Sequence, residues 1–274
     1  MISSFSNLVA RRDLLRELTL SELRSQSQET RLGWVWWLVD PLIMMLIYWA
    51  VVVGLFGRGE RYEPYPVFIL CALLPWKHLA SSLNASAKVL RSREALIKSI
   101  PFPTMALPLT IVAAAFSNFL FGLAVLLAAA WAFGRPLGTP LAQLPALMAL
   151  QLVLVTGLGL VVSCLGALVR DLAGFLTHLL RVGFYLSPTL YGLDLVRERA
   201  AEQALAGSPL ADWIPTLYTL NPFVPLITGY RDALFYGRFM EPSLWVWLVV
   251  ASGLLLFAGF RLYQVFDRRV IKFL

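Results

Sequence analysis

The 274-residue chain has few charged residues and very few cysteines and histidines. Charged residues make up 14% of the sequence and hydrophobic residues 59%, whereas a soluble domain has about 25% charged residues. The mean hydropathy is +0.72. A single soluble core cannot bury this apolar excess, so the composition predicts an integral membrane protein and excludes disordered, fibrous and disulfide-linked classes. The two cysteines, Cys71 and Cys164, lie in apolar runs and are expected to be buried thiols.

Motifs of several enzyme classes are also missing. The sequence has no G-x-x-x-x-G-K-[ST] phosphate loop, no H-E-x-x-H zinc motif and no G-x-S-x-G nucleophile elbow. Its two histidines, His78 and His178, are far apart in the sequence and have no cluster of carboxylates or thiols beside them. The sequence therefore predicts no catalytic residues, no metal site and no cofactor in this chain.

Six stretches are long and apolar enough to cross a bilayer, which takes about 20 residues of helix. We expect these spans at about 34–56, 65–88, 104–133, 141–169, 172–193 and 243–264. The segment between the fifth and sixth spans is broken by prolines into apolar pieces that are too short to span. Because irregular backbone at membrane depth has to be shielded by protein, we expect re-entrant or interfacial helices there.

The N-terminal residues form a separate segment. Residues 7–31 are charged but carry leucines at roughly helical spacing, which is typical of an amphipathic helix at the membrane surface. A solvated helix packed on a partner fits the same pattern. The predicted fold is thus an all-α integral membrane domain of six transmembrane helices at 34–274, preceded by a cytoplasmic amphipathic interface helix at 1–33.

Lysine and arginine residues indicate the orientation. If the N-terminus is cytoplasmic, 14 of the 23 basic residues lie on the cytoplasmic side, 7 lie outside, and Lys77 and Arg181 fall inside spans. Cytoplasmic loops of membrane proteins carry such an excess of basic residues. Both termini are therefore predicted to face the cytoplasm, and the net charge of +7 reflects this orientation rather than nucleic-acid binding.

The two basic residues inside spans have polar neighbours on the same helix face. Lys77 shares a stripe of the second span with Ser81 and Asn84, and Arg181 shares a face of the fifth span with Tyr185. A charged side chain facing lipid is costly. These residues either line a polar path for an anionic substrate or pair with carboxylates or backbone carbonyls at helix interfaces, and the sequence leaves both alternatives open.

The start of the first span is rich in tryptophan. Trp34, Trp36 and Trp37 fit an aromatic belt at the membrane interface, and they also fit a platform that stacks on sugar rings. Asp40 directly precedes Pro41. Because aspartate favours the N-cap and proline the first helical turn, this pair predicts that Asp40 caps the lipid-spanning part of the first helix.

Two short cytoplasmic connections carry charged residues. The segment RSREALIKSIPFP at 91–103 is expected to be helical up to Ile100, where prolines stop it. Its apolar Leu96 and Ile97 suit docking into a groove on another protein, with a plain interfacial turn as the alternative. The tight corner at Arg170 and Asp171 either transmits force or simply ends two helices.

Six motifs follow one another along nearly the whole chain, namely RLGWVWWLVDPL (31–42), YPVFILCALLPWKHL (65–79), LIKSIPFP (96–103), ALVRD (167–171), SPTLYGLD (187–194) and NPFVPLITGYRDALF (221–235). In order and spacing they resemble the ABC-2 type (type V exporter) permeases that export polysaccharides such as O-antigen, capsule or teichoic acid. The resemblance implies a transport subunit of the bacterial cytoplasmic (inner) membrane that is not an enzyme.

The resemblance also implies partners. Two copies of the chain would form a homodimeric pore, and two copies of a separate ATPase would bind beneath it and hold the ATP and magnesium. The cargo would be a glycan linked to a polyprenyl or other lipid. An exporter of a drug or small lipid in the same fold, and a polytopic glycan-processing membrane enzyme, are the alternatives.

Residue roles follow from the same resemblance. The helix at 91–100 would be a coupling helix that contacts the ATPase, and the corner at Arg170 and Asp171 would be the second contact. The coupling residues would be Arg91, Arg93, Glu94, Leu96, Ile97, Arg170 and Asp171. Since pores of this family are rich in aromatics, the resemblance adds Trp34, Trp36, Trp37 and Tyr48 to the expected substrate path. The remaining path residues come from the polar stripes of the spans and not from the resemblance, and they are Lys77, Ser81, Asn84, Arg181 and Tyr185.

Overall fold

A computed structural model describes residues 12–28, 33–55, 57, 60–99, 103–135, 138–205 and 213–267. Regular structure in these ranges is helical throughout, as predicted. The α-helices are α2 (Arg12–Gln28), α3 (Trp36–Trp49), α4 (Tyr65–Ser92), α5 (Glu94–Ser99), α6 (Ala106–Ala132), α7 (Leu144–Leu168), α8 (Leu172–Leu186), α9 (Leu193–Leu205), α10 (Ile214–Thr219), α11 (Phe223–Arg231) and α12 (Pro242–Asp267). Shorter 3-10 and π turns are η1 (Gly33–Val35), η2 (Ala50–Leu55), η3 (Glu60–Tyr62), η4 (Thr139–Gln143) and η5 (Asp232–Tyr236).

Five helical stretches in the described ranges are long and apolar enough to cross a membrane. They are Trp36–Leu55, Tyr65–Ser92, Ala106–Ala132, Thr139–Leu168 and Pro242–Phe266, which match the predicted first, second, third, fourth and sixth spans. The predicted fifth span contains α8, an apolar helix of 15 residues. At about 1.5 Å per residue this helix is shorter than the hydrocarbon core of a bilayer. The chain is thus a multi-pass membrane protein, and its described residues hold five helices that are long and apolar enough to span.

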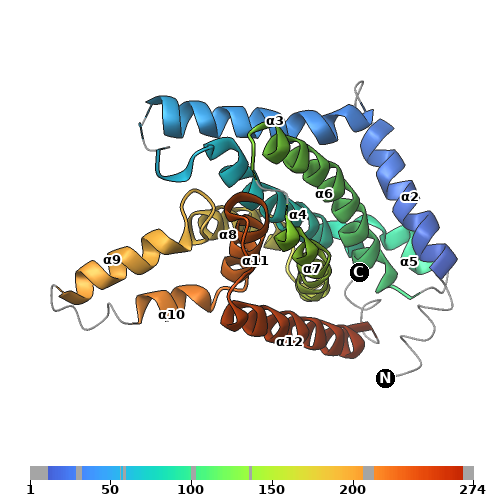
Figure 1. The fold of residues 1–274 in the computed structure, drawn as a ribbon. Coiled ribbons are helices and arrows are strands. Elements are labelled where there is room, and N and C mark those ends of the chain that lie inside the picture. The colour runs from blue at the N-terminus through green and yellow to red at the C-terminus, as the bar shows by residue number, and fades with distance from the viewer. Residues whose placement is uncertain are drawn as a thin grey trace.

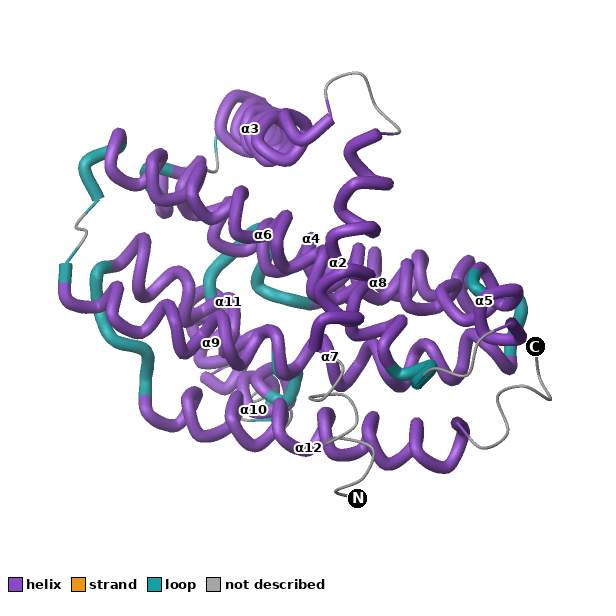
Figure 2. The backbone as a smooth tube through the Cα atoms, turned by 90° about the vertical axis from the view of Figure 1, so that its right-hand side faces the viewer, coloured by secondary structure: helices purple, strands orange, loops and turns teal. Residues whose placement is uncertain are grey.

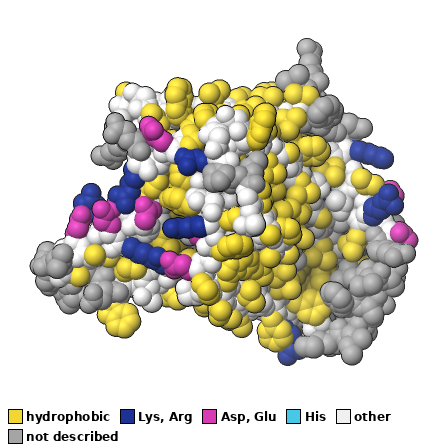
Figure 3. Space-filling view, viewed as in Figure 1, with side chains coloured by type: hydrophobic (Ala, Val, Ile, Leu, Met, Phe, Trp, Pro, Cys, Tyr) yellow, Lys and Arg dark blue, Asp and Glu magenta, His cyan; other side chains and the backbone are white. Residues whose placement is uncertain are grey.

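The long helices run side by side between two ends of the molecule (Figure 1). Helices α2 and α5 lie at one end, where α12 also ends, and α9 and α10 lie at the opposite end. Apolar side chains cover the middle of the face seen in Figure 3, and charged side chains gather toward the two ends. This distribution fits a membrane band around the middle of the helices.

Helix α4 is at the centre of the fold and α3 is at its edge. In the most apolar stretch of α4, 78% of the residues are buried, whereas only 6% are buried in that of α3. Figure 2 shows α3 standing apart from the helices below it. The difference arises because α4 packs on α3, α6, α7, α8 and α11, whereas α3 has protein on one side only.

Glycines allow α7 to pack closely on its neighbours. A Cβ atom at Gly157 would lie 2.5 Å from the backbone carbonyl carbon of Leu255 in α12, and one at Gly166 would lie 2.0 Å from the carbonyl oxygen of Ala87 in α4. Backbones can approach to this distance only where a side chain is absent. The two glycines therefore fix the positions of α4 and α12 against α7.

Helix α11 is too short to cross a membrane and is almost entirely buried. Tyr230 donates a hydrogen bond to Gln151 Oε1 at 2.6 Å, and the Gln151 side-chain amide nitrogen lies 2.8 Å from His78 Nδ1. This buried chain joins α11 to α7 and α4. It satisfies polar groups that would otherwise be orphaned in an apolar core.

Helix α2 packs on the rest of the protein. Leu15 and Leu18 contact an apolar cluster that includes Val89, Ile97 and Met105, from α4, α5 and the start of α6. The apolar face of α2 is thus at least partly covered by protein. Residues 1–11 and 29–32 of the predicted interface segment, and 100–102 at the end of the predicted coupling helix, lie outside the described residues.

Candidate functional site

The predicted path residues of the second and fifth spans lie on one face formed by α3, α4 and α8. Asn84 of α4 accepts a hydrogen bond from the Thr177 hydroxyl of α8 at 3.0 Å. About two turns away, toward the start of α4 and the end of α8, the rings of Trp76 and Phe184 lie 5.8 Å apart. These two contacts show that α4 and α8 are antiparallel neighbours, so their polar stripes border each other.

Lys77 forms an ion pair with Asp40 of α3 on this face. The Lys77 side chain is 50% exposed and that of Asp40 is 36% exposed. This contact is the carboxylate pairing expected under one of the two alternatives for Lys77. Because both side chains remain at the surface, the pair also leaves Lys77 facing the space outside α4.

The structure corrects the role predicted for Asp40. Val35, in the turn η1, precedes the first residue of α3, and Asp40 lies inside the helix beside Pro41. The reason is that α3 continues through Trp36 and Trp37, so the helix has already begun when Asp40 is reached. Asp40 is therefore a partner of Lys77 and caps no helix end.

Helix α8 presents two stripes outside its buried side. Its polar stripe consists of His178, Arg181 and Tyr185, which follow each other at three- and four-residue spacing and are all exposed. A neighbouring apolar stripe is equally exposed and consists of Phe175, Leu179, Val182 and Leu186. In the described part of the chain, the Arg181 guanidinium contacts no carboxylate. The face thus carries a cation without a protein counter-ion.

Of the remaining predicted path residues, some lie on the α3–α4–α8 face and others lie elsewhere. Tyr48 is half-buried and its ring lies 6.2 Å from that of Phe184, so it belongs to the α3–α4–α8 face. Trp37 packs instead on Phe121 of α6 at 5.3 Å, on another side of α3. Trp36 is exposed. The side chain of Trp34 lies outside the described part of the structure, and Ser81 donates to the carbonyl of His78 within α4.

The residues predicted to contact an ATPase gather at the end of the molecule that holds α2 and α5. Arg91 donates to the carbonyl oxygen of Ala167 at 2.8 Å, and Arg93 pairs with Glu22 of α2 at 3.3 Å. Arg170 and Asp171 are exposed in the corner between α7 and α8. The Arg91 bond therefore joins the two predicted contact corners.

Within α5 the predicted contact residues face different ways. Glu94 pairs with Lys98 at 2.5 Å along the helix, and Leu96 is half-buried. Ile97 is only 7% exposed and packs into the protein's own apolar cluster. Ile97 therefore anchors α5, and its exposed neighbours are the residues that a partner can reach.

Sequence analysis missed the role of Arg231, which it counted among the outside basic residues. The side chain is 2% exposed and donates to the backbone carbonyls of Phe68, Pro188, Thr189 and Tyr191 at 2.5–3.3 Å. Its guanidinium also lies 3.6 Å from the centre of the Phe68 ring. The only signal in the sequence is an arginine beside tyrosine in an otherwise apolar stretch, and that signal does not distinguish a buried arginine from an exposed one.

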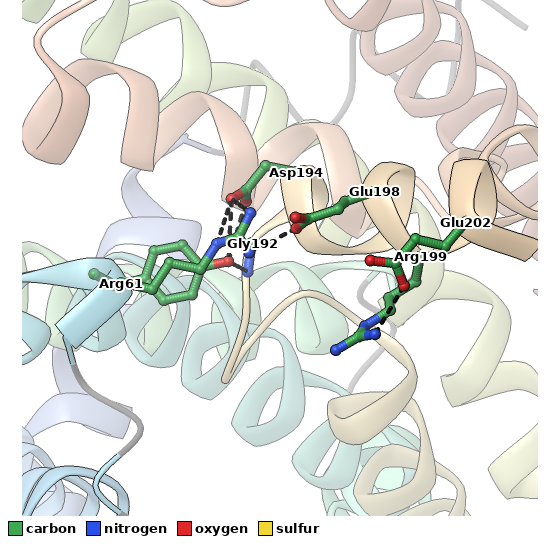
Figure 4. A network of polar contacts seen from close by, with 7 residues as sticks. Arg61, Gly192, Asp194, Glu198, Arg199 and Glu202 are labelled. Carbon is green, nitrogen blue, oxygen red and sulfur yellow. Dashed lines mark hydrogen bonds and ion pairs between the residues drawn. The ribbon is translucent and has the colours of Figure 1, made fainter.

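A group of charged residues fixes the start of α9 at the other end of the molecule (Figure 4). Arg61 of η3 binds Asp194 at 3.0 Å and Glu198 at 2.6 Å. The Tyr62 hydroxyl also contacts Asp194 and accepts the backbone N–H of Gly192. We call Arg61, Tyr62, Gly192, Asp194 and Glu198 the α9 network.

Two further ion pairs lie beside the α9 network, around a polar pocket of about 350 Å³. Arg197 makes two 2.9 Å hydrogen bonds to Glu241, and these bonds lower the pKa of the Glu241 carboxyl. Arg238 binds Asp232 at 2.7 Å. Burial raises the pKa of Asp232, and the bond from Arg238 opposes this shift. Most carboxylates at this end are thus neutralised by arginine.

Three curated relatives cover most of the chain, although no model of a protein family matches it. The O-antigen export system permease protein RfbA of Myxococcus xanthus is 25% identical over 264 residues, which is 96% of each chain. An RfbA of Klebsiella pneumoniae is 27% identical over 228 residues, 82% of this chain and 81% of its own. The polysialic acid transport protein KpsM of Escherichia coli is 24% identical over 258 residues, 93% of each chain.

These names denote transport proteins and not enzymes, in agreement with the sequence prediction. The similarity extends over all the elements described above, from α2 to α12, rather than over one motif. The chain is thus a relative of the O-antigen and polysialic acid export proteins, and its resemblance to the ABC-2 type permeases of polysaccharide export is confirmed.

Proposed function

We propose that this chain is the permease subunit of an ABC transporter that exports a lipid-linked polysaccharide across the bacterial cytoplasmic membrane. The observation that carries the proposal is the similarity to an O-antigen export permease over 96% of both chains. The helices long enough to span a membrane supply the architecture that such a subunit needs.

In the proposed topology α8 completes six spans. At 15 residues it reaches across the bilayer only together with the residues that follow it, through the turn at 187–192. Helices α10 and α11 then form a re-entrant segment on the extracytoplasmic side, where α11 is shielded by protein. Both α2 and the end of α12 lie at one end of the molecule, which supports a common cytoplasmic side for the two termini (Figure 1).

In the proposed transporter, a separate ATPase subunit holds ATP and magnesium and powers transport. It binds at the end of the permease formed by α2, α5 and the α7–α8 corner. The exposed charges of Arg93, Arg170 and Asp171 and the half-buried Leu96 offer a mixed polar and apolar docking surface there. The Arg91 bond to Ala167 gives a direct route from α5 to α7. Movement of the docked ATPase would thus reach two spans at once.

The proposed path for the cargo is the polar face of α3, α4 and α8. Polar side chains of spans reach the surface there, at Lys77, Ser81 and Arg181. The exposed side of α12 is apolar in contrast, with Val246, Val249 and Leu254. Since charges at membrane depth face water or protein rather than lipid, the polar face is the side to line a channel.

A second copy of the chain would close this channel. The apolar stripe of α8 (Phe175, Leu179, Val182, Leu186) and the exposed side chains of α3 border the polar face and have no cover within the described residues. Exposed apolar patches mark contacts with another protein or with the membrane, and the α8 stripe is the one that borders the proposed cargo path. We place the two-fold contact of the homodimer on this stripe.

The proposal is tested by deleting the gene in its host and measuring glycan on the cell surface. We expect surface glycan to disappear and lipid-linked glycan to accumulate inside, with recovery by the wild-type gene. A Leu96→Asp variant should not restore export, and a tagged Leu96→Asp chain should no longer co-purify with the ATPase. Ala201→Asp, on the exposed side of α9, is the matched control and should behave as wild type. Unchanged surface glycan after deletion would contradict the proposed function.

A further inference from the structure

Two cations converge on the polar face at the same depth. The Asn84–Thr177 bond sets the register of α4 against α8, and counting along the antiparallel helices places Arg181 opposite residue 80. Lys77 is three residues from that position, or about 4.5 Å along the helix axis. The two basic side chains therefore project from adjacent helices within one turn of each other, and both are exposed.

Asp40 is the one carboxylate that the described spans bring to this pair. It reaches Lys77 from α3, a helix at the edge of the fold of which only 6% of the most apolar stretch is buried. With Asp40, Lys77 and Arg181 ionised, the group has a net charge of +1. Two cations alone would be costly at membrane depth. The Asp40 carboxylate lowers the net charge of the group, and with it this cost, while no ligand is bound.

The Lys77 side chain differs from a cation that only stabilises the fold, because it is exposed. The Arg231 side chain, which is structural, has its guanidinium N–H groups bonded to backbone carbonyls and is 2% exposed. In the described part of the chain Lys77 pairs with Asp40 alone, and half of its side chain is exposed. An ammonium group has three donors, so a second anion can bind Lys77 without prior unfolding of either helix.

We infer that Lys77 and Arg181 form a binding site for the phosphate group of a lipid, and that Asp40 is the built-in counter-ion which that phosphate displaces. The inference rests on the proposed function, because it takes the polar face as the cargo path. Arginine and lysine bind phosphate by charge-assisted hydrogen bonds. Leu179 and Val182, exposed beside Arg181, supply an apolar surface for the lipid chain.

Displacement of Asp40 would give the site a threshold. A neutral lipid cannot compete for Lys77, whereas a phosphate brings enough charge to replace Asp40 and to neutralise Arg181 as well. Asp40 is thus a specificity-determining residue and has no direct contact with the cargo. It makes the site select anionic head groups and keeps the empty face close to neutral.

The experiment measures binding of farnesyl phosphate, farnesol and inorganic phosphate to the full-length chain in nanodiscs. We expect farnesyl phosphate to bind more tightly than either of the others. Lys77→Met and Arg181→Met should each weaken its binding by about tenfold or more, since a hydrogen bond to a charged group is lost. Asp40→Asn should strengthen binding by about fivefold, the upper range for releasing an exposed ion pair.

Arg199→Gln is the matched control, because it removes one exposed arginine of α9 and should leave binding unchanged. The double variant Asp40→Asn/Lys77→Met avoids an unpaired carboxylate in the membrane and should bind as weakly as Lys77→Met. Weaker or unchanged binding by Asp40→Asn would overturn the counter-ion role. Equal binding of farnesol would overturn the phosphate site, and equal binding of inorganic phosphate would overturn the lipid assignment.

Export in cells separates this inference from the proposed function. If deletion abolishes surface glycan but the Lys77, Arg181 and Asp40 variants bind the phosphate probe like wild type, the inference fails and the function stands. If the probe follows the predicted order while surface glycan survives deletion, the function fails and the site stands.

Discussion

The basic residues of this protein differ mainly in whether other groups of the protein bury and bond their charged side chains. Arg231 is buried and bonded to carbonyls on all sides, whereas Lys77 and Arg181 remain open on a helix face. The net charge of +7 conceals this difference. Two arginines with the same formal charge thus serve the fold in one place and remain available to a ligand in the other.

Replacing Arg231 should destabilise the protein strongly. Arg231→Met leaves four backbone carbonyls without their donor, and each lost bond to a buried group costs about 1–3 kcal/mol. We expect the melting temperature in detergent to fall by about 10 °C or more. Arg231→Lys should rescue little of this loss, because one ammonium cannot match the fork of a guanidinium. Arg199→Met, an exposed control, should shift the melting temperature by about 1 °C or less.

The Arg197–Glu241 pair should make stability depend on pH in the acid range. Glu241 has a pKa lowered below its ordinary value of 4.5 by the bonds from Arg197. A lowered carboxyl pKa stabilises the folded state above the ordinary value, and this contribution is lost as pH falls through the lowered pKa. The melting temperature of wild type should therefore exceed that of Glu241→Gln at pH 7 and approach it near pH 3. An equal difference at both pH values would contradict the pair's contribution.

At the scale of helices, close packing of α7 decides where its neighbours lie. Gly157 and Gly166 allow α12 and α4 to approach to backbone contact. The central position of α4 follows from this packing and from its contacts with α3, α6, α8 and α11. Helix α3 packs mainly on α4 and α6, and its one charged contact in the described region is the Asp40–Lys77 pair.

Gly157→Ala should push α12 away from α7. The added Cβ would lie 2.5 Å from the Leu255 backbone, and backbone cannot swing aside as a side chain does. Overpacking of this kind costs about 1–3 kcal/mol, so we expect a drop in melting temperature of several degrees. Gly253→Ala is the matched control, since nothing lies within 4 Å of its added Cβ. A drop of the same size in both variants would contradict the packing explanation, because alanine is a better helix former than glycine and no contact of the added Cβ explains a loss at Gly253.

At the scale of the whole molecule, the uncovered surfaces indicate what the single chain lacks. The polar face and the apolar stripe of α8 lie side by side, and a channel requires a second wall. The opposite end carries ion-paired arginines and carboxylates around the start of α9 (Figure 4). One side of the molecule thus offers the surface for the proposed contact with another copy, and one end holds its own elements together by ion pairs.

Cysteine cross-linking should test the proposed contact between two copies. The native cysteines are buried, so a new exposed cysteine reports on its own position. Leu179→Cys on the α8 stripe should give a disulfide-linked dimer on mild oxidation of membranes. Leu254→Cys on α12, which is equally exposed, should remain monomeric on a denaturing gel. The reverse result would place the dimer contact on α12.

The sequence by itself determined the membrane class, five of the spans and the family resemblance, because these depend on local hydropathy and on residues in fixed order. It also placed Lys77, Ser81 and Asn84 on one stripe, since helical periodicity alone requires it. The short length of α8, the position of Asp40 inside α3 and the burial of Ile97 did not follow from the pattern. Helix ends depend on packing as much as on composition.

Only the tertiary structure decided which charged residues meet. Asp40 and Lys77 are 37 residues apart in the sequence, and Arg231 reaches a carbonyl 163 residues away. No periodicity encodes such contacts, because they depend on how helices are placed against one another. The sequence shows where the glycines that allow this close packing lie. Which helix packs against each glycine is decided only by the fold.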